Sequence, residues 1–223
     1  SELSPWTRYS LRVEGKPAKS ETITSTVEGS FTTAPLSDQK ETVRLVVTTC
    51  GEHIRRDDPE NGHLIYREIV EQIQPHFFVH TGDIEYYDKK DPWAHSVQLA
   101  RYKMNRLYAM PYNRLLHNST ASYFMKDDHD ITIDDAWPGK NFGMLRWDDG
   151  LAIFNEQFPM GDKPYRTVRW GKDLQIWLVE GRNYRSPNEM PDGPDKSIWG
   201  QEQKQWFFDS VNESAATFTL LIS

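Results

Sequence analysis

Apolar and polar residues alternate with a period close to two between residues 6 and 33. The turn-forming residues 14–17 (Glu-Gly-Lys-Pro) interrupt this pattern, which predicts antiparallel strands on either side of them. The stretch 33–38 that follows has the composition of a linker. We therefore expect residues 1–38 to form part of a small β-sandwich-like domain, and residues 39–223 to form a second domain.

The second segment alternates apolar strands with helical segments. Continuous apolar runs at 43–50 and 76–80 flank residues 64–73, whose Leu, Ile and Val side chains recur at helical spacing. Strand, helix and strand in this order form a βαβ-like unit, which predicts neighbouring parallel strands. A helix at 93–110 and a strand at 122–125 continue the pattern.

The last part of the chain predicts a further sheet. Residues 165–170 and 174–179 predict two paired strands around a tight turn, and a helix at 200–211 and a strand at 217–222 close the chain. The order of elements predicts an α/β fold.

Composition indicates a globular chain. The 37% hydrophobic content, with eight Trp, ten Tyr and ten Phe, excludes a disordered polymer. No apolar run reaches the roughly 18 residues that a transmembrane helix needs. Thirty-three acidic against 26 basic residues give a formal charge of -7, which disfavours a nucleic-acid partner and is compatible with bound cations. A single cysteine cannot form an intrachain disulfide, and the chain starts without a signal-like leader, so neither feature decides the compartment.

Ligand-type side chains follow three of the predicted strands. Cys50 ends the first strand, Asp83 follows the second, and the run 127–130 (Asp-Asp-His-Asp) follows the third. Because the carboxyl ends of parallel strands open into one crevice, we expect these side chains to converge there. Tyr86, three residues after Asp83, adds a phenol to the group.

The combination of residue types indicates a cation. A Gly-Asp turn is an ordinary loop former and a lone cysteine is more often a small hydrophobe, so Asp83 and Cys50 indicate a metal only together. Thiolate, carboxylate and phenolate in one place favour trivalent iron over zinc or magnesium. Three carboxylates in the run 127–130 repel one another unless a cation neutralises them.

Other polar residues admit more than one role. His129 suits a metal ligand, a proton donor or a phosphate contact, because imidazole serves each near neutral pH. Asp134 and Asp135 either reach a second metal or face water. Arg182 and Arg185 flank a loop after a predicted strand, where phosphate binding and surface salt bridges explain them equally well. The chain has neither a Walker-type loop nor a Gly-x-Ser-x-Gly elbow, which excludes the ATPase and serine-hydrolase classes.

Several ordered motifs resemble those of the alkaline phosphatase D family, within the calcineurin-like metallophosphatases. The matching segments are 29–35 (GSFTTAP), 49–50 (TC), 80–86 (HTGDIEY), 127–130 (DDHD), 180–185 (EGRNYR) and 200–206 (GQEQKQW). The resemblance covers nearly the whole chain. It implies a metallophosphatase-type α-β-β-α sandwich, preceded by the end of a small antiparallel β domain.

The resemblance also implies roles for single residues. Cys50, Asp83 and Tyr86 look like iron (Fe³⁺) ligands, with Asp83 also facing calcium. The other implied site residues are Asp128 and Asp134 as second-metal ligands, His129 as the catalytic histidine, and Arg182 or Arg185 as the phosphate contact. Zinc, manganese or magnesium are alternative metals. The family implies a small phosphate-ester substrate and an extracellular or periplasmic location, and leaves the oligomeric state open.

Two departures from the wider group bear on function. The first strand ends in Thr-Thr-Cys without the Asp-x-His of the superfamily, which is the usual form of the narrower family. Relatives complete their metal site with a later Gly-Asp-x-His segment, and this chain ends at Ser223 before one occurs, so the C-terminal part of the fold is expected to be missing.

These features favour a phosphoric-ester hydrolase, a phosphomonoesterase or phosphodiesterase, that uses a metal-activated water. The first alternative is a non-catalytic metal-binding fragment or an inactive relative that lacks the closing ligands. A second alternative, an aromatic-rich glycan-binding module, rests only on the Trp content and ranks far behind, because Trp is usually buried in a core.

Overall fold

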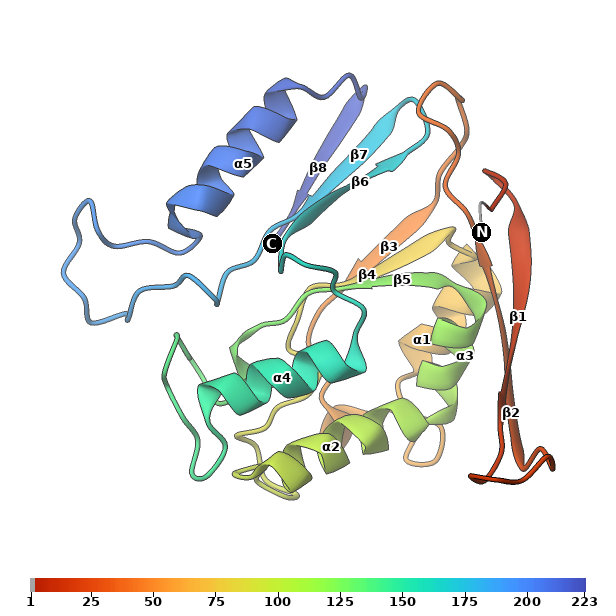
Figure 1. The fold of residues 1–223 in the computed structure, drawn as a ribbon, viewed down its shortest axis with the longest axis horizontal. Helices are drawn as coiled ribbons and strands as arrows, with labels where there is room; N and C mark the ends of the chain where they lie inside the picture. Colours follow the sequence, from red (N-terminus) through yellow and green to blue (C-terminus); the bar gives the residue numbers. More distant parts are fainter. Residues whose placement is uncertain (1–2) are drawn as a thin grey trace.

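The structure is a computed structural model that describes residues 3–223. Two three-stranded sheets pack against each other, and helices cover their outer faces (Figure 1). This four-layer arrangement is the α-β-β-α sandwich expected from the motifs. A separate two-stranded hairpin lies at one side of it.

Parallel strands make up the first sheet, in the order β3 (Leu45–Thr48), β4 (Phe77–His80) and β5 (Ala121–Phe124). Between β3 and β4 the chain forms α1 (Leu64–Glu68), which continues as a π-helix, η2 (Ile69–Ile73), so the predicted βαβ unit is confirmed.

Strand β4 is buried on both faces. Phe77 and Val79 pack toward the second sheet, whereas Phe78 packs against Tyr66 of α1. A continuous apolar run is what a strand covered on both sides requires, because successive side chains point to opposite faces.

Two helices lie between β4 and β5, where the sequence pattern predicted one. They are α2 (Val97–Ala109) and α3 (Pro111–Ser119). The helical pattern breaks at Met110, whose ψ of 135° is extended, and Pro111 occupies the first turn of the next helix, where proline needs no hydrogen-bond donor.

Helix α4 (Trp147–Gln157) was not predicted. It contains Gly150, a residue that weakens helices in isolation. In the structure a Cβ atom at Gly150 would lie 2.1 Å from the carbonyl oxygen of Ile131, so glycine is what lets α4 pack closely on that loop. Tertiary packing, and not local propensity, explains this helix.

The second sheet contains β6 (Arg166–Trp170) and β7 (Leu174–Leu178), which are antiparallel, and β8 (Phe218–Ile222), which runs parallel to β7. Ile176 and Leu178 face the first sheet, while Trp177 faces α5 (Gly200–Asn212). The indole Nε1 of Trp177 donates a hydrogen bond of 2.9 Å to Ser210 Oγ of that helix.

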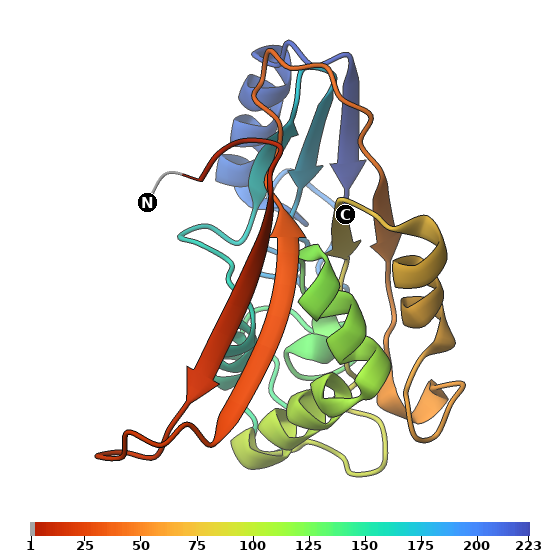
Figure 2. The same ribbon diagram turned by 90° about the vertical axis from the view of Figure 1, so that its right-hand side faces the viewer.

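The hairpin consists of β1 (Arg8–Gly15) and β2 (Ser25–Thr32) in antiparallel register. It lies along α3, with Gly29 next to the backbone of Asn118 (Figure 2). Whether residues 1–38 belong to a separate domain stays a prediction.

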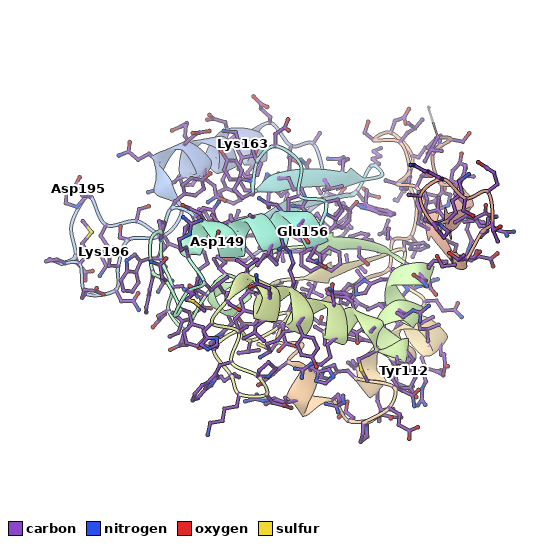
Figure 3. All side chains as sticks on the ribbon, turned by 60° about the horizontal axis from the view of Figure 1, so that its bottom comes forward. Tyr112, Asp149, Glu156, Lys163, Asp195 and Lys196 are labelled. Atoms are coloured by element: carbon purple, nitrogen blue, oxygen red, sulfur yellow. The ribbon has the colours of Figure 1, made fainter. Side chains whose placement is uncertain are left out.

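Charged side chains populate the outer surface. A long connection between β7 and α5 carries Asp195 and Lys196 at its outer end (Figure 3). Within residues 3–223 no helix has both the length and the apolar composition needed to cross a membrane.

Candidate metal centre

The loops after β3 and β4 are locked together by their backbones. Cys50 N–H donates to Gly82 O at 3.2 Å, and Gly51 N–H donates to Asp83 O at 2.8 Å. Cys50 and Asp83 both have positive φ, 59° and 52°, which L-residues rarely adopt. Strand β3 therefore ends at Thr48, and not at residue 50 as predicted, because the backbone turns sharply before Cys50.

Gly82 is required where the two loops meet a third. Its φ is 114°, and a Cβ atom there would lie 2.5 Å from the backbone nitrogen of Asp127. Only glycine combines this backbone conformation with so close an approach. The Gly-Asp pair therefore brings the end of β4 next to the loop that follows β5.

Asp83 is the centre of the first group of site residues. The hydroxyl of Tyr86 donates to Asp83 Oδ2 at 3.0 Å, and Cys50 Sγ lies 3.7 Å from the same oxygen. The other oxygen, Oδ1, is buried without a hydrogen-bond partner. Burial, and then the charge of Asp127, raise the pKa of Asp83. A buried carboxylate oxygen without a partner, beside a thiol and a phenol, is suited to a cation.

Asp83 also belongs to a second group, with Asp128 and His129. One possible ligand atom from each of the three residues lies within 4.8 Å of the other two. Asp128 and His129 are buried in a single 3₁₀ turn, η3 (Asp128–Asp130), directly after β5. The residues present thus fit a metal centre in which Asp83 is shared by two sets of ligands.

The imidazole of His129 is held from several sides. Its Nδ1 lies 2.7 Å from Asp88 Oδ1, and its ring packs against the Tyr86 ring at a tilt of 35°, with centroids 4.2 Å apart. Its Nε2 lies 3.5 Å from Asp134 Oδ1. Burial by itself lowers the pKa of His129, but the hydrogen bond and charge of Asp88 outweigh it and raise the pKa above its ordinary value.

The three carboxylates of the run 127–130 have three different environments. Asp128 belongs to the candidate metal group, and Asp127 pairs with the Nε of Arg182. Asp130 is fully buried and does not belong to the group, and it accepts hydrogen bonds from Glu85 N at 3.0 Å and Asp127 N at 2.9 Å. Its role is to hold the loop, and burial raises its pKa well above the ordinary value.

Asp134 and Asp135 lie at the rim. The side chain of Asp134 is 75% exposed, although its Oδ1 lies near Nε2 of His129. Asp134 is therefore close to the group of Asp83, Asp128 and His129 but lies outside the buried part of that group. The backbone N–H of Asp135 donates to Asp128 Oδ2 at 2.5 Å, while its side chain turns toward the arginines.

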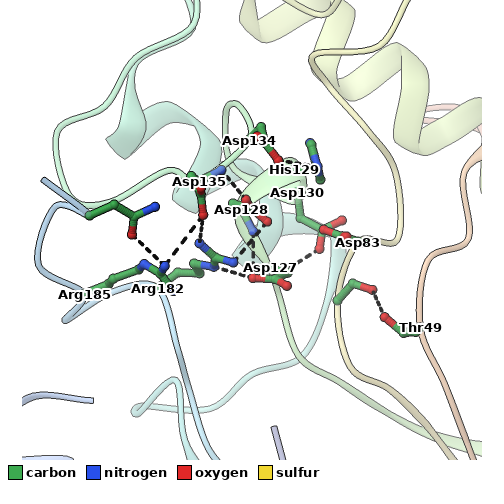
Figure 4. A network of polar contacts seen from close by, with 12 residues as sticks. Thr49, Asp83, Asp127, Asp128, His129, Asp130, Asp134, Asp135, Arg182 and Arg185 are labelled. Carbon is green, nitrogen blue, oxygen red and sulfur yellow. Dashed lines mark hydrogen bonds and ion pairs between the residues drawn. The ribbon is translucent and has the colours of Figure 1, made fainter. Parts of the chain in front are cut away.

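Both predicted arginines reach the site (Figure 4). Arg182 Nη2 lies 3.4 Å from Asp128 Oδ1, and Arg185 Nη2 lies 3.6 Å from Asp135 Oδ1. The Arg182 side chain is only 12% exposed, so its ion pairs are part of the site and are not surface salt bridges. A hollow of about 230 Å³ opens beside Asp127, Arg182 and Arg185.

Sequence reasoning missed three residues of the site. Asp88 holds His129, and Lys126 forms a buried ion pair with Glu180 immediately before the arginine loop. Lys126 directly precedes the 127–130 motif and Glu180 begins the 180–185 motif, which was an available signal. Asp88 had none, because an aspartate in a polar loop is indistinguishable in sequence from a solvated one.

The family model described as PhoD-like phosphatase matches residues 45–223. A solved structure described as "Structure of PhoD" superposes with a TM-score of 0.79 at 17% identity, covering 98% of this chain and 47% of that one. The purple acid phosphatase PPD1 from yellow lupin (Lupinus luteus) seeds gives a TM-score of 0.63 at 13% identity, covering 99% of this chain and 36% of that one.

At these identities the two structures establish the fold alone. The chain spans less than half the length of either. No curated protein matches the chain in sequence.

Proposed function

The chain belongs to the PhoD-like phosphatase family, and from this premise we propose that it supplies the metal-binding part of a phosphoric-ester hydrolase. The observation that carries the proposal is the set of contacts made by Asp83. Its carboxylate contacts Cys50 and Tyr86, lies within the Asp128 and His129 group, and keeps one buried oxygen without a partner. A carboxylate shared by two ligand sets is suited to hold the two neighbouring metal ions of two-metal phosphatase chemistry.

The family resemblance and the chemistry of the donor atoms together assign the ligands. Cys50, Asp83 and Tyr86 would hold Fe³⁺, since three anionic donors stabilise a high charge. Asp83, Asp128 and Asp134 would hold Ca²⁺, which prefers oxygen donors. When bound, such ions acidify water and neutralise charge on phosphoryl oxygens. Zinc, manganese and magnesium are the alternatives that elemental analysis would distinguish.

The protein's own groups would position and protonate the substrate. Asp88 occupies Nδ1 of His129, so Nε2 is the nitrogen available to carry a proton to the leaving-group oxygen. Arg182 and Arg185 line the hollow beside Asp127 and would bind phosphate oxygens. The substrate is then a small phosphate ester, either a monoester or a diester, and we propose an extracellular or periplasmic location for the enzyme.

Substitution of Asp83 tests the function. We expect Asp83→Ala to lose bound metal, measured by elemental analysis, and hydrolysis of both p-nitrophenyl phosphate and bis-p-nitrophenyl phosphate. Asp38→Asn, on the exposed linker, is the control and should keep both properties. If Asp83→Ala protein kept full metal content and full turnover, the assignment would be wrong.

A metal-binding chain without turnover is the second candidate, because this chain spans 47% of the PhoD structure that it resembles. It predicts stoichiometric metal in the wild-type protein, dependent on Asp83, and no hydrolysis of either ester. The same pair of measurements therefore separates the two functions.

A further inference from the structure

A buried ion pair joins the carboxyl ends of the two sheets. Lys126 Nζ lies 3.1 Å from Glu180 Oε1, and the two side chains are 3% and 2% exposed. Lys126 follows β5 and precedes Asp127, while Glu180 follows β7 and precedes the arginine loop. The pair thus lies where the two site-forming loops begin.

Glu180 holds the arginine loop through its side chain. Its Oε1 accepts a hydrogen bond of 2.8 Å from the backbone N–H of Arg182, and its Oε2 accepts one of 2.6 Å from that of Asn183. Both carboxylate oxygens are therefore committed to the loop, and such charge-assisted hydrogen bonds are stronger than neutral ones.

Helix α5 fixes Glu180 in turn. Glu180 N–H donates to Gln203 Oε1 at 2.7 Å, and Gln203 Nε2 donates to Glu180 O at 2.8 Å. Gln203 is itself 1% exposed. The residue that orients the loop is anchored to the outer helix layer as well as to Lys126.

These contacts form a closed network that includes Arg182. Its backbone N–H is bound by Glu180, and its guanidinium pairs with Asp127, the neighbour of Lys126. The network therefore fixes both the backbone and the guanidinium of Arg182. Stability alone does not require buried charges here, because well-packed apolar side chains often stabilise a core equally well.

We propose that Glu180 is a positioning residue for substrate, acting through Arg182, with Lys126 setting its place. The proposal rests on the proposed function, in which Arg182 binds the phosphate. Glu180 touches no substrate in this scheme. By holding the backbone of Arg182, it fixes the place from which the guanidinium reaches a phosphate oxygen, and a small misplacement of such a group weakens binding of every phosphate ester.

The test removes both charges together, in the double variant Lys126→Met/Glu180→Gln, so that no buried charge is left unpaired. For the metal-loaded protein, we expect KM for p-nitrophenyl phosphate and Ki for inorganic phosphate to rise roughly tenfold, the weight of about one charge-assisted hydrogen bond. Metal content and kcat should stay near the wild-type values. A purely structural role would lower thermal stability and leave KM and Ki unchanged.

A matched control is available in Lys163 and Glu202, an ion pair whose side chains are 56% and 72% exposed. Lys163→Met/Glu202→Gln makes the same chemical changes on the surface and should leave KM and Ki unchanged. Glu180→Asp is the second variant. It keeps the charge and retracts the carboxylate by one methylene, so it should raise KM and Ki even if the double variant does not fold.

Three results would overturn the proposal. The first is a double variant with normal metal content whose KM and Ki stay within about twofold of wild type. The second is loss of metal or kcat in that variant without a change in KM. The third is an unfolded double variant together with unchanged KM and Ki in Glu180→Asp.

Failure of the proposed function is a separate result. Calorimetric binding of inorganic phosphate to the metal-loaded protein measures positioning without turnover. A wild-type protein that binds phosphate but does not hydrolyse esters overturns the function alone, provided that Glu180→Asp weakens phosphate binding. A wild-type protein that neither binds nor hydrolyses overturns both.

Discussion

Asp88 Oδ1 lies 2.7 Å from Nδ1 of His129, although 41 residues separate the two along the chain. The other oxygen of Asp88 accepts a hydrogen bond of 3.0 Å from the backbone N–H of Asp134. One carboxylate therefore fixes both the orientation of the imidazole and the loop that follows it. A charged partner on Nδ1 also stabilises the protonated ring.

Asp88→Asn should slow hydrolysis most where the leaving group needs a proton. Asparagine keeps the size of the side chain but removes the charge behind His129. We expect kcat for phenyl phosphate to fall roughly 10-fold to 100-fold, a fraction of what general acid catalysis contributes. The change for 2,4-dinitrophenyl phosphate, whose leaving group departs unprotonated, should be much smaller. Steady-state kinetics with both esters would measure the difference, and an equal fall for both would contradict the proton-donor role of His129.

Tyr86→Phe and Tyr87→Phe are a natural pair of variants. Tyr86 donates to Asp83, whereas the hydroxyl of Tyr87 is buried without a hydrogen-bond partner. We expect Tyr86→Phe to lose metal, and its metal-free form to be less stable by about 1 to 2 kcal/mol for the lost hydrogen bond. Tyr87→Phe should keep its metal and be as stable as wild type or more so. Elemental analysis and urea unfolding measure both, and equal metal content in the two variants would exclude Tyr86 as a ligand.

Asp130→Ala should act on folding and not on ligation. The substitution leaves the buried backbone N–H of Glu85 and the partly buried backbone N–H of Asp127 without acceptors. We expect a loss of roughly 2 to 5 kcal/mol in the free energy of unfolding, since each unsatisfied group costs about 1 to 3 kcal/mol. Urea unfolding of the metal-free protein measures this loss. Metal bound per folded molecule, determined at low temperature, should be unchanged, and its disappearance would make Asp130 a candidate ligand.

His117 makes the stability depend on pH. Burial lowers the pKa of His117 to about 4, from an ordinary value of 6.5. As pH falls below 6.5, His117 becomes protonated in the unfolded chain but stays neutral in the folded one, so stability is lost on acidification. Between pH 7.5 and 5 this loss amounts to about 2 kcal/mol.

His117→Phe should remove that share of the loss. The ring lies beside Phe78, Tyr108 and Phe124, where another aromatic ring fits. The variant gives up a hydrogen bond of 2.9 Å with Ser122 Oγ, so we expect lower stability at neutral pH and a flatter pH dependence. Urea unfolding across pH 5 to 7.5 tests the slope, and an unchanged slope would show that other groups cause it.

The periodicity of apolar residues was sufficient to predict those strands whose burial follows a regular pattern. The apolar run of β4, and the turn that separates β6 from the largely apolar β7, identify those strands from sequence alone. The start of a new helix at Pro111 and the glycine inside α4 cannot be predicted from periodicity in this way. Gly150 makes sense only beside Ile131, which belongs to another segment of the chain.

Site chemistry divides in the same way. Cys50, Asp83 and the run 127–130 could be expected at one edge of the sheet, since parallel strands place their carboxyl ends together. Residue type alone does not say which aspartate of the run enters the site, because Asp128 and Asp130 are the same residue type two positions apart, and only the family resemblance singled out Asp128. The single turn of η3 directs one into the ligand group and the other into the core.

By itself, then, the sequence determined the order of strands and helices and the residue types that follow each strand. Only the tertiary structure decided which of these side chains meet. Asp88 with His129, and Lys126 with Glu180, come from separate elements, and no local pattern encodes the distance between them. That distance is set by how the two sheets and their helices pack, and only close packing of the whole core determines it.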